Sequence, residues 1–350
     1  MTRNKTFIFK SPPTGYPVPG EHITVEDRPV DTSSAPAGGV LAELLYASYD
    51  PYLRGRMRDP KIPSYSPPFQ PDAPVVNDTV VRVLKSDSPE WKEGDLAIAF
   101  LPIAEYARLD ADALKAARFR RVTNDKGLDL AVFLGPLGMP GLTGYAGLHR
   151  IGKPKKGETV FVSSAAGAVG QVVGQVAKRE GLRVIGSVGS DDKLKFITEE
   201  LGFDGGFNYK TEKPGDALKR LAPEGIDIYF ENVGGEQLEA AIDNMKQGGR
   251  IPICGMISDY NTPPEKRYGI KNLHMAIARR ITLQGFMVGD KEFGPAYYQE
   301  HQENVGKWIT EGSFHPKIYV TEGIDNAAEG FVNMLKGGNF GKAVLKIKAE

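Results

Sequence analysis

The fold is decided by the stretch Thr159-Val-Phe-Val-Ser-Ser-Ala-Ala-Gly-Ala-Val-Gly170. Its first residues are apolar and predict a buried strand, and the small residues that follow predict a tight turn into a helix. Gly167 would let the backbone approach a phosphate, Gly170 would let the helix pack closely on the strand, and the helix N-terminus would present unpaired N–H groups to the anion. Ala165 replaces the first glycine of the usual dinucleotide fingerprint. The alternative is a strand-to-helix turn without a ligand.

The residues after this turn favour a nucleotide-binding unit. Apolar residues recur at helical spacing from Gln171 to Glu180, and Gly181 is a typical helix end. A second apolar run, Arg183-Val-Ile-Gly-Ser-Val188, predicts a neighbouring strand. A strand, helix and strand of these lengths form the βαβ unit of a dinucleotide-binding fold.

The end of the second predicted strand bears on the choice between NAD and NADP. An NAD site places an acidic residue about 20 residues after the fingerprint, where it binds the ribose hydroxyls. That position falls near Val188, which is followed by Gly189 and, shortly after, by Lys193. The small strand end and the lysine leave space and positive charge for a 2′-phosphate, which favours NADP(H). A solvated helix residue is the alternative for Lys193, because Asp191 and Asp192 partly cancel its charge.

Composition limits the partners of the chain. Its 44 basic residues balance 44 acidic residues, so no overall charge would attract nucleic acid or an anionic membrane surface. We therefore expect a small-molecule partner, with no nucleic acid and no membrane. The N-terminus lacks the apolar core of a secretory signal, and the single cysteine excludes an internal disulfide. Both features favour a cytoplasmic protein.

No metal site is expected. One cysteine cannot build a four-cysteine zinc site, and the chain has no His-Glu-x-x-His motif. The five histidines are scattered along the sequence. Cys254 lies in the apolar run Arg250–Gly255, where a thiol usually packs inertly. We assign Cys254 no nucleophilic role.

The segment Leu130–Leu148 carries no charged residue and is long enough to suggest a membrane span. Five glycines and two prolines interrupt it, which argues against a spanning helix. We expect instead a buried, glycine-rich domain junction with a helix that starts near Thr143.

The order of predicted elements indicates two domains. Residues 1–135 are rich in proline and in short β-like runs such as Thr79–Leu84, which is typical of a β-rich domain with long loops. Residues 136–313 alternate strands and helices, which predicts a doubly wound α/β domain with a parallel sheet. Residues 314–350 return to strand character, and we expect them to rejoin the first domain.

Motifs along nearly the whole chain resemble one family. They are Asp50-Pro-Tyr-Leu-Arg-Gly-Arg-Met57, Leu137–Leu148, Ala165–Gly170, Phe207–Lys210, Glu231–Gly235, Cys254–Asn261 and Leu335–Lys342. This ordered set resembles the prostaglandin reductase and alkenal double-bond reductase branch of the zinc-independent medium-chain dehydrogenases. The resemblance implies a GroES-like catalytic domain, an NADP-binding Rossmann domain, a cleft between them for nicotinamide and substrate, and a homodimer.

The resemblance also implies which residues hold NADP(H). They are Gly167, Ala168, Val169 and Gly170 toward the pyrophosphate; Lys193 and Tyr209 toward the 2′-phosphate; Asn232, Cys254, Gly255, Met256, Ile257, Ser258, Asp259 and Tyr260 toward the ribose and nicotinamide; Phe286, Met287, Val288 and Asn339 around the nicotinamide; and Met139, Thr143 and Gly189 elsewhere in the cofactor site. Tyr209 and Phe286 have an alternative as core aromatic residues.

The reaction that the resemblance implies is NADPH-dependent reduction of the carbon–carbon double bond of α,β-unsaturated aldehydes or ketones. Hydride adds to the β-carbon and leaves an enolate, which needs charge stabilisation and a proton at the α-carbon. Tyr260 is the candidate donor because a phenol can donate a proton at neutral pH. Tyr52 resembles a tyrosine that lines the same pocket. A ribose hydroxyl of the cofactor, or water, is the alternative proton source.

Two segments depart from the family pattern and leave the substrate open. Residues 71–79 lack the usual glycines, and residues 101–106 lack the usual tryptophan. An NADPH:quinone oxidoreductase or a secondary alcohol dehydrogenase is an alternative, because one fold supports several chemistries. A non-catalytic NADPH-binding protein is the third possibility.

Overall fold

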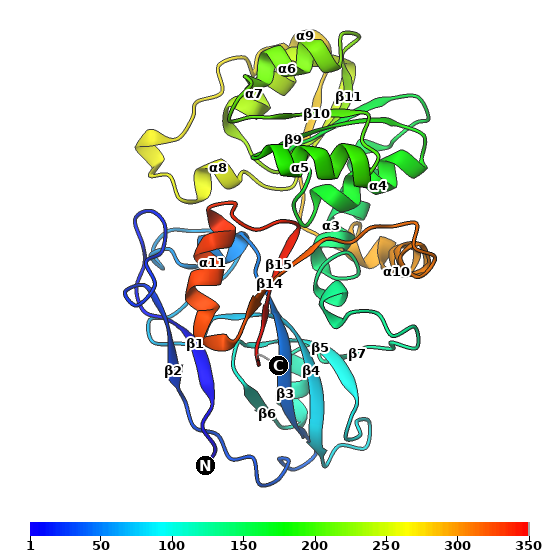
Figure 1. Cartoon of the computed structure of the whole chain (residues 1–350). Coiled ribbons are helices and arrows are strands. Elements are labelled where there is room, and N and C mark those ends of the chain that lie inside the picture. Colours follow the sequence, from blue (N-terminus) through cyan, green and yellow to red (C-terminus); the bar gives the residue numbers. More distant parts are fainter. Residues whose placement is uncertain (349–350) are drawn as a thin grey trace. The chain divides into compact units, whose positions relative to one another are not determined.

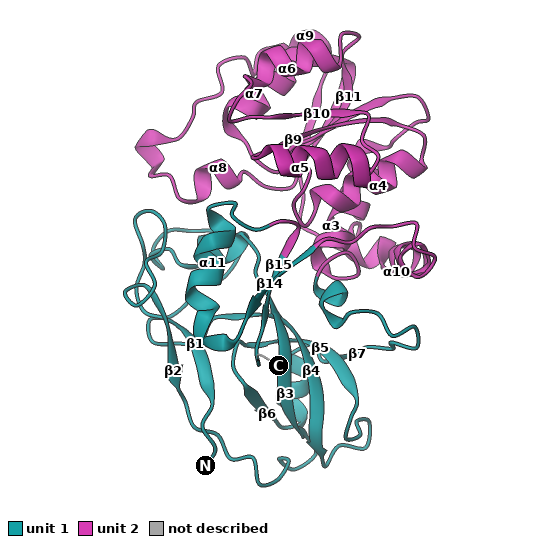
Figure 2. Ribbon diagram, in the orientation of Figure 1, with its two compact units in different colours: residues 1–134, 318–339, 343–350 teal, residues 135–317, 340–342 magenta. Residues whose placement is uncertain are grey.

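The computed structural model describes residues 1–348. The chain divides into two compact units (Figure 2). The first comprises residues 1–134, 318–339 and 343–348, and the second comprises residues 135–317 and 340–342. Residues 314–317 and 340–342, which we expected in the first domain, therefore belong to the second unit.

Side chains of helix α4 (Gly170–Arg179) explain this difference. The buried Gln175 accepts from the His315 N–H at 2.8 Å and donates to the His315 carbonyl at 3.3 Å. Gln171 makes the same pair of bonds to Lys317, at 2.8 and 3.1 Å. The Lys342 N–H in turn donates to the Lys317 carbonyl at 2.9 Å. These residues lie far apart in the sequence, so local composition did not indicate their contacts.

The second unit is built on a parallel sheet with the strand order β10-β9-β8-β11-β12-β13 (Figure 1). The strands are β8 (Thr159–Val162), β9 (Arg183–Val188), β10 (Gly205–Asn208), β11 (Ile226–Phe230), β12 (Met245–Ile253) and β13 (Thr282–Gly285). The central strands are apolar because helices cover both faces of the sheet. Phe161 of β8 stacks on Tyr229 of β11 with ring centroids 4.7 Å apart and on Phe207 of β10 at 5.9 Å.

Helices α4 and α5 lie on one face of this sheet, and α6 and α7 lie on the other (Figure 1). Besides α3 (Met139–Gly147), η2 (Leu148–Gly152) and α4, the second unit contains the helices α5 (Asp191–Lys195), η3 (Phe196–Glu200), α6 (Pro214–Leu221), α7 (Gly235–Asn244), α8 (Ile257–Tyr260), η4 (Pro264–Lys266), α9 (Met275–Arg279) and α10 (Gly294–Thr310). The doubly wound α/β fold that the alternating pattern predicted is confirmed.

The glycine-rich segment Leu130–Leu148 folds into a short 3₁₀ helix, η1 (Leu130–Leu134), and helix α3 (Met139–Gly147), which runs on into a π-helical turn, η2 (Leu148–Gly152). The expected helix start near Thr143 is wrong, because α3 begins one turn earlier. Pro140 lies in the first turn of α3, where a proline costs no hydrogen bond. Among residues 1–348, no helix combines the length and the apolar character needed to cross a membrane.

The first unit contains a sheet in the order β14-β15-β3-β4-β5-β7, with β6 paired to β3, and a separate pair, β1-β2. The pairings of β3 with β15, β4 and β6, and of β5 with β4 and β7, are antiparallel. The strands are β1 (Lys5–Phe9), β2 (Ile23–Asp27), β3 (Val40–Ser48), β4 (Val76–Ser86), β5 (Leu96–Pro102), β6 (Tyr106–Leu109), β7 (Arg120–Arg121), β14 (Ile318–Glu322) and β15 (Lys342–Lys346). The helices are α1 (Tyr52–Arg56), α2 (Ala111–Ala116), η5 (Ile324–Asn326) and α11 (Ala327–Leu335), with η1 given above. The expected β-rich domain is thus present.

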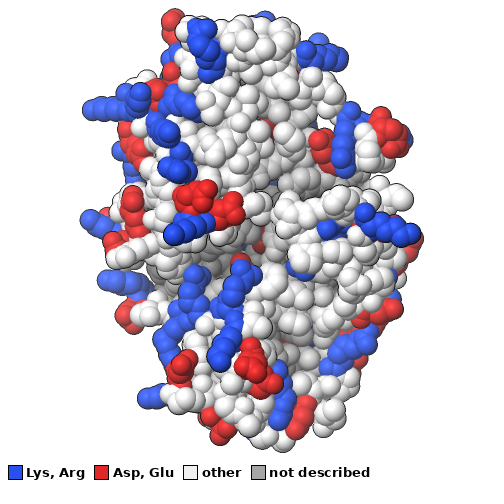
Figure 3. Space-filling view, turned by 180° about the vertical axis from the view of Figure 1, so that it is seen from behind, with Lys and Arg blue, Asp and Glu red and all other residues white. Residues whose placement is uncertain are grey.

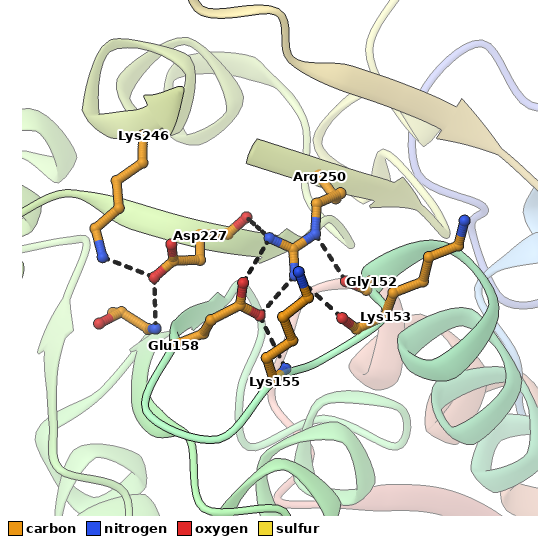
Figure 4. A network of polar contacts seen from close by, with 8 residues as sticks. Gly152, Lys153, Lys155, Glu158, Asp227, Lys246 and Arg250 are labelled. Carbon is orange, nitrogen blue, oxygen red and sulfur yellow. Dashed lines mark hydrogen bonds and ion pairs between the residues drawn. The ribbon is translucent and has the colours of Figure 1, made fainter. Parts of the chain in front are cut away.

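A polar network lies near the amino ends of the parallel strands (Figure 4). Arg250 donates to both carboxylate oxygens of Glu158, at 2.9 and 2.6 Å, and to the Gly152 carbonyl at 2.9 Å. The Asp227 carboxylate accepts from the Lys246 ammonium at 2.8 Å. The side chains of Arg250 and Glu158 are only 18% and 17% exposed, so solvent screens this pair less than a surface pair.

Charged side chains of both signs are spread over the face drawn in Figure 3. This mixture agrees with the formal net charge of zero. The face in view therefore does not present the single-sign surface that nucleic-acid binding uses.

Candidate active site

The residues expected at the cofactor site gather at one edge of the parallel sheet. Gly189 follows β9, Tyr209 follows β10, Cys254 follows β12, Phe286 follows β13, and Asn232 lies two residues after β11. The glycine turn follows β8. Because the strands are parallel, their carboxyl ends share this edge. The strand order reverses between β8 and β11, and such a switch point is where open α/β sheets bind ligands.

The glycine turn after β8 is tightly built. Ser164 has a left-handed backbone with φ of 51°, and its carbonyl accepts from the Gly167 N–H at 2.9 Å. A Cβ on Gly170 would lie 2.3 Å from the Ser164 carbonyl oxygen, so only glycine fits where α4 begins. Val169 precedes α4, and no side chain of the described residues caps the helix there. The N–H groups of Gln171 and Val172 donate to the carbonyls of Gly167 and Val169, at 3.1 and 3.0 Å. An anion such as a phosphate would therefore be attracted by the positive end of the helix dipole and by the turn that precedes it.

Strand β9 provides the space for Ala165, the residue that replaces the first fingerprint glycine. Ala165 is fully buried, and a Cβ on Gly186 of β9 would lie 2.6 Å from the Ala165 Cβ. From the C-terminal tail, Gly341 forms a bridge with Gly167. Gly341 has φ of 86°, and a Cβ there would lie 2.2 Å from the Lys317 carbonyl oxygen. Fingerprint spacing predicted neither glycine contact.

Lys193 lies in α5, which begins just after β9. Ser190 caps this helix, because its Oγ accepts from the Lys193 N–H at 3.3 Å. Burial, and secondarily the charge of Lys210, hold the pKa of Lys193 below its ordinary value. A bound anion would offset the repulsion between the two lysines. Sequence reasoning gave Lys210 no role, although it directly follows Tyr209 in a quoted motif.

Tyr209 is a surface residue rather than a core aromatic residue, since it is 44% exposed. A Cβ on Gly189 would lie 3.0 Å from the Tyr209 hydroxyl oxygen, so the ends of β9 and β10 lie side by side. The nearby Asp191 carboxylate accepts from the Asn208 amide at 2.8 Å. This corner of the sheet therefore presents a phenol, with two lysines close by.

A buried carboxyl group follows β11. Glu231 Oε1 accepts from the Tyr229 hydroxyl at 2.8 Å and from the N–H groups of Val233 and Gly234 at 2.6 and 2.8 Å. The Ser163 hydroxyl, at the end of β8, lies 3.3 Å from the same oxygen. Burial raises the pKa of Glu231 above its ordinary value. Glu231 lies in the motif Glu231–Gly235, for which we expected no role of the acid itself; its position directly after an apolar strand was the available signal.

Asn232 is anchored to the end of β8. Its side-chain amide donates to the Ser163 carbonyl at 2.8 Å, and its backbone N–H donates to the Ser163 Oγ at 2.9 Å. The two strands that flank the switch point are thus tied together beyond their last ladder hydrogen bonds. The Asn232 carbonyl accepts from the Ile257 N–H at 3.2 Å, and Ile257 belongs to the segment that contains Tyr260.

The segment Cys254–Tyr260 rests on the turn after β11. The N–H groups of Cys254 and Gly255 donate to the Glu231 carbonyl at 2.9 and 3.2 Å. A Cβ on Gly255 would lie 2.9 Å from the Tyr260 hydroxyl oxygen, so glycine at 255 leaves room for the phenol. Burial, with the nearby Glu231 charge, raises the pKa of Cys254 to about 12. The thiol therefore keeps its proton at neutral pH and is a poor nucleophile.

The Phe286 side chain packs as a core residue. Its ring stacks on Phe293, with centroids 5.0 Å apart, and meets Phe230 edge-on at 6.5 Å. The next residue, Met287, is 42% exposed. The Phe286 ring is thus a core aromatic residue, as the alternative interpretation of the sequence held, whereas Met287 remains accessible at the edge of the sheet.

The remaining predicted residues lie outside the strand ends. Met139 and Thr143 lie in the first turns of α3, where the Thr143 hydroxyl donates to the Met139 carbonyl at 2.7 Å. Asn339 and Tyr52 belong to the first unit. The edge of the parallel sheet therefore collects most, but not all, of the predicted residues.

Tyr52 belongs to a buried polar cluster of the first unit. Its hydroxyl donates to the Asn77 Oδ1 at 2.8 Å, and the Asn77 amide donates to Asp50 at 2.9 Å and to the Ser48 carbonyl at 2.7 Å. Burial, together with the Asp50 carboxylate, holds the pKa of Tyr52 well above its ordinary value. The Tyr52 phenol therefore stays protonated at neutral pH and directs its proton at Asn77.

Within residues 1–348, no three His, Cys, Asp or Glu side chains gather as potential ligands.

Sequence comparisons agree with this architecture. Residues 5–117 match the family described as the N-terminal domain of oxidoreductase, and residues 168–303 match the zinc-binding dehydrogenase family. The chain is 54% identical to the NADP-dependent oxidoreductase RED1 of Cochliobolus heterostrophus, over 99% of this chain and 98% of that protein. It is 40% identical to a 2-alkenal reductase (NADP(+)-dependent) of Nicotiana tabacum, over 99% and 98% of the two chains.

A solved structure shows the same arrangement of elements. The crystal structure of CurA from Vibrio vulnificus in complex with NADPH is 33% identical, covers 99% of this chain and 100% of its own, and superposes with a TM-score of 0.88. This chain has a β-rich unit and a unit built on a doubly wound parallel sheet with a glycine turn, and the relatives that match its whole length are oxidoreductases. The chain belongs to the medium-chain dehydrogenase/reductase superfamily, in its zinc-independent branch.

Proposed function

We propose that this enzyme reduces the carbon–carbon double bond of α,β-unsaturated aldehydes or ketones, with NADPH as the hydride donor. The observation that carries the proposal is the set of loops at the carboxyl edge of the parallel sheet, with the Lys193–Lys210 pair at the end of β9 and β10 and the Tyr260 segment after β12. The likeness to a 2-alkenal reductase over almost the whole chain supports the choice of substrate class.

The cofactor is NADP(H), and the residues present fit it. The N-terminus of α4 and the glycine turn would hold the pyrophosphate. Lys193, Lys210 and Tyr209 would hold the 2′-phosphate, because two cations and a phenol are the donors that a phosphate accepts from. Asn232 and the segment Cys254–Tyr260 would face the ribose and the nicotinamide. The same assignment covers Met139, Thr143, Gly189, Phe286–Val288 and Asn339 as the outer parts of the cofactor site.

The chemistry that NADPH supplies when bound is hydride donation to the β-carbon of the substrate. Negative charge then develops on the carbonyl oxygen, and the α-carbon requires a proton. Tyr260 supplies the hydrogen bond or the proton. We assign this role to Tyr260, because it lies in the segment that follows β12 at the carboxyl edge of the parallel sheet. A cytoplasmic location and a homodimer remain predictions, to be checked by fractionation and by light scattering.

Turnover assays with three matched arms test this proposal. The purified protein is incubated with NADPH and 2-hexenal, with NADPH and 1,4-naphthoquinone, and with NADH and 2-hexenal, and the products are identified by mass. We expect the saturated aldehyde with NADPH and much less of it with NADH. Quinone consumption without saturated aldehyde would instead indicate a quinone oxidoreductase, and NADPH binding without turnover in any arm would indicate a non-catalytic protein.

A further inference from the structure

Glu231 is a buried titratable group that the reaction outlined above does not use. It lies directly after β11 and is fully buried. Its Oε1 accepts from the Tyr229 hydroxyl and from the N–H groups of Val233 and Gly234. Its Oε2 is buried and has no hydrogen-bond partner among residues 1–348. Burying a carboxyl oxygen without a hydrogen-bond partner destabilises the fold. The compensating stabilisation must therefore come from the groups that Oε1 binds.

Oε1 holds a turn that the backbone does not favour by itself. Gly234 and Gly235 have φ of 78° and 58°, and two successive left-handed residues are available only to glycine at low cost. Glycines also make the turn flexible in the absence of other restraints. The two N–H groups that Oε1 accepts from belong to this turn. The carboxyl group therefore fixes a conformation that the glycines permit but do not enforce.

The same turn supports the segment that carries Tyr260. The carbonyls of Asn232 and Val233 accept from the N–H groups of Ile257 and Ser258 at 3.2 and 3.0 Å. A Cβ on Gly234 would lie 3.0 Å from the Met256 Cβ, so the two chain segments are packed at backbone distance. A shift of the turn would move helix α8, and with it the Tyr260 phenol.

We propose that Glu231 is a positioning residue for the reduction: through Oε1 it fixes the turn Asn232–Gly235, and through that turn it fixes the segment Cys254–Tyr260 beside the hydride-transfer site. This inference rests on the proposed function for the role of Tyr260. Glu231 touches neither substrate nor cofactor in this account. Its acceptor oxygen matters, and its negative charge does not.

Three substitutions separate the acceptor oxygen from the charge. Glu231→Gln keeps an acceptor at the Oε1 position and removes the charge, so it should retain most of the turnover. Glu231→Asp keeps the charge but draws the acceptor back by one methylene, and Glu231→Leu removes the acceptor. Because misplacement of a catalytic group by about 1 Å can cost about 10²-fold in rate, kcat should fall by about that factor in both, with a smaller change in the KM for NADPH. The Asp and Gln variants both keep a polar acceptor at this position, so their comparison tests the proposal if the Leu variant does not fold.

Glu158→Leu is the matched control, since it removes a carboxyl group from the same sheet. Glu158 holds Arg250 near the amino ends of the strands (Figure 4). This variant should lose stability without losing turnover per folded molecule. A fall in kcat for Glu158→Leu as large as that for Glu231→Leu would show that general destabilisation explains both, and would overturn the proposal. Equal losses in Glu231→Gln and Glu231→Asp would overturn it as well.

Amide hydrogen exchange tests the positioning without substrate or cofactor. Peptides that cover residues 232–260 should exchange faster in Glu231→Asp than in the wild type, whereas Glu231→Gln and Glu158→Leu should leave them protected. Unchanged exchange in Glu231→Asp would overturn the positioning role whatever the substrate is. Faster exchange in a protein that reduces no enal would instead support the positioning of this segment and reject the proposed function.

Discussion

The substitution Gly170→Ala tests whether the turn after β8 is built for a phosphate. The new Cβ would lie 2.3 Å from the Ser164 carbonyl oxygen and 2.8 Å from the Ala165 Cα. Ordinary close carbon–oxygen contacts lie at about 3.3 Å, so the start of α4 must move by about 1 Å. Both neighbouring atoms belong to the backbone, which cannot rotate away as a side chain can.

The expected loss follows from the cost of this overlap. Overpacking by one methyl group in a tight site costs about 1–3 kcal/mol. The helix N–H groups have to occupy their original position to meet the pyrophosphate, so binding has to restore the strained arrangement. We therefore expect the Kd for NADPH to rise by about 5- to 150-fold.

A second glycine in the same helix provides the control. A Cβ on Gly174 would lie 1.9 Å from the ring of Phe203, which is a comparable overlap one turn further along α4. Gly174→Ala should lower the melting temperature and leave the Kd for NADPH unchanged. Cofactor fluorescence titration gives the Kd, and thermal unfolding monitored by circular dichroism gives the stability of both variants.

Two results would refute this reasoning. Wild-type affinity in a folded Gly170→Ala variant would mean that the turn does not contact the cofactor. An equal loss of affinity in Gly174→Ala would mean that the effect comes from the stability of α4 and not from the position of its first turn.

The remaining predictions concern the proton donor, the 2′-phosphate and a buried histidine. Tyr260→Phe should lower kcat by about 10²-fold, the contribution typical of a general acid, with unchanged NADPH affinity; unchanged turnover would remove Tyr260 from the mechanism. Lys210→Ala should weaken NADPH binding by about 1 kcal/mol, or about fivefold, and leave NADH binding unaffected; calorimetric titration of both cofactors checks this, and an equal loss for NADH would contradict it. Burial lowers the pKa of His301 to about 4, whereas an unfolded chain binds this proton near pH 6.5. Stability should therefore be complete above about pH 6.5 and fall by about 3 kcal/mol as the pH drops to 4. In His301→Asn, the free energy of unfolding measured by urea denaturation should change less between pH 6.5 and pH 4. An unchanged pH dependence would show that other groups cause it.

The sequence predicted the parallel sheet because short-range signals suffice for it, and the candidate site residues lie at one edge of that sheet. Alternating apolar runs and glycine stops identify βαβ units, and parallel pairing then brings every strand end to one edge. Tyr209 and Cys254 were expected inside strands, and the structure places each directly after one, β10 and β12. The start of α3 at Met139 was missed, because Pro140 was treated as a helix breaker although a first-turn proline is compatible with a helix.

The contacts that could not be predicted join residues that are distant in sequence. Gly186 accommodates Ala165 from a neighbouring strand, and Gly341 meets Gly167 from the far end of the chain. Glu231 is similar, because an acid at the end of an apolar strand indicates an unusual environment but not what the carboxyl group binds. The packing of Phe286 against Phe293 likewise depends on the path of the chain after β13, which periodicity does not specify.

The most direct test of the central claim follows the hydride. The purified enzyme is incubated with 2-hexenal and NADPH deuterated at the transferring position of nicotinamide C4, and the product is analysed by mass spectrometry and NMR. The account predicts hexanal with deuterium on the β-carbon and, in a parallel reaction in D₂O with unlabelled NADPH, deuterium on the α-carbon. An allylic alcohol with deuterium on C1, the former carbonyl carbon, would contradict this reaction, because it would show that the enzyme reduces the carbonyl group and not the double bond.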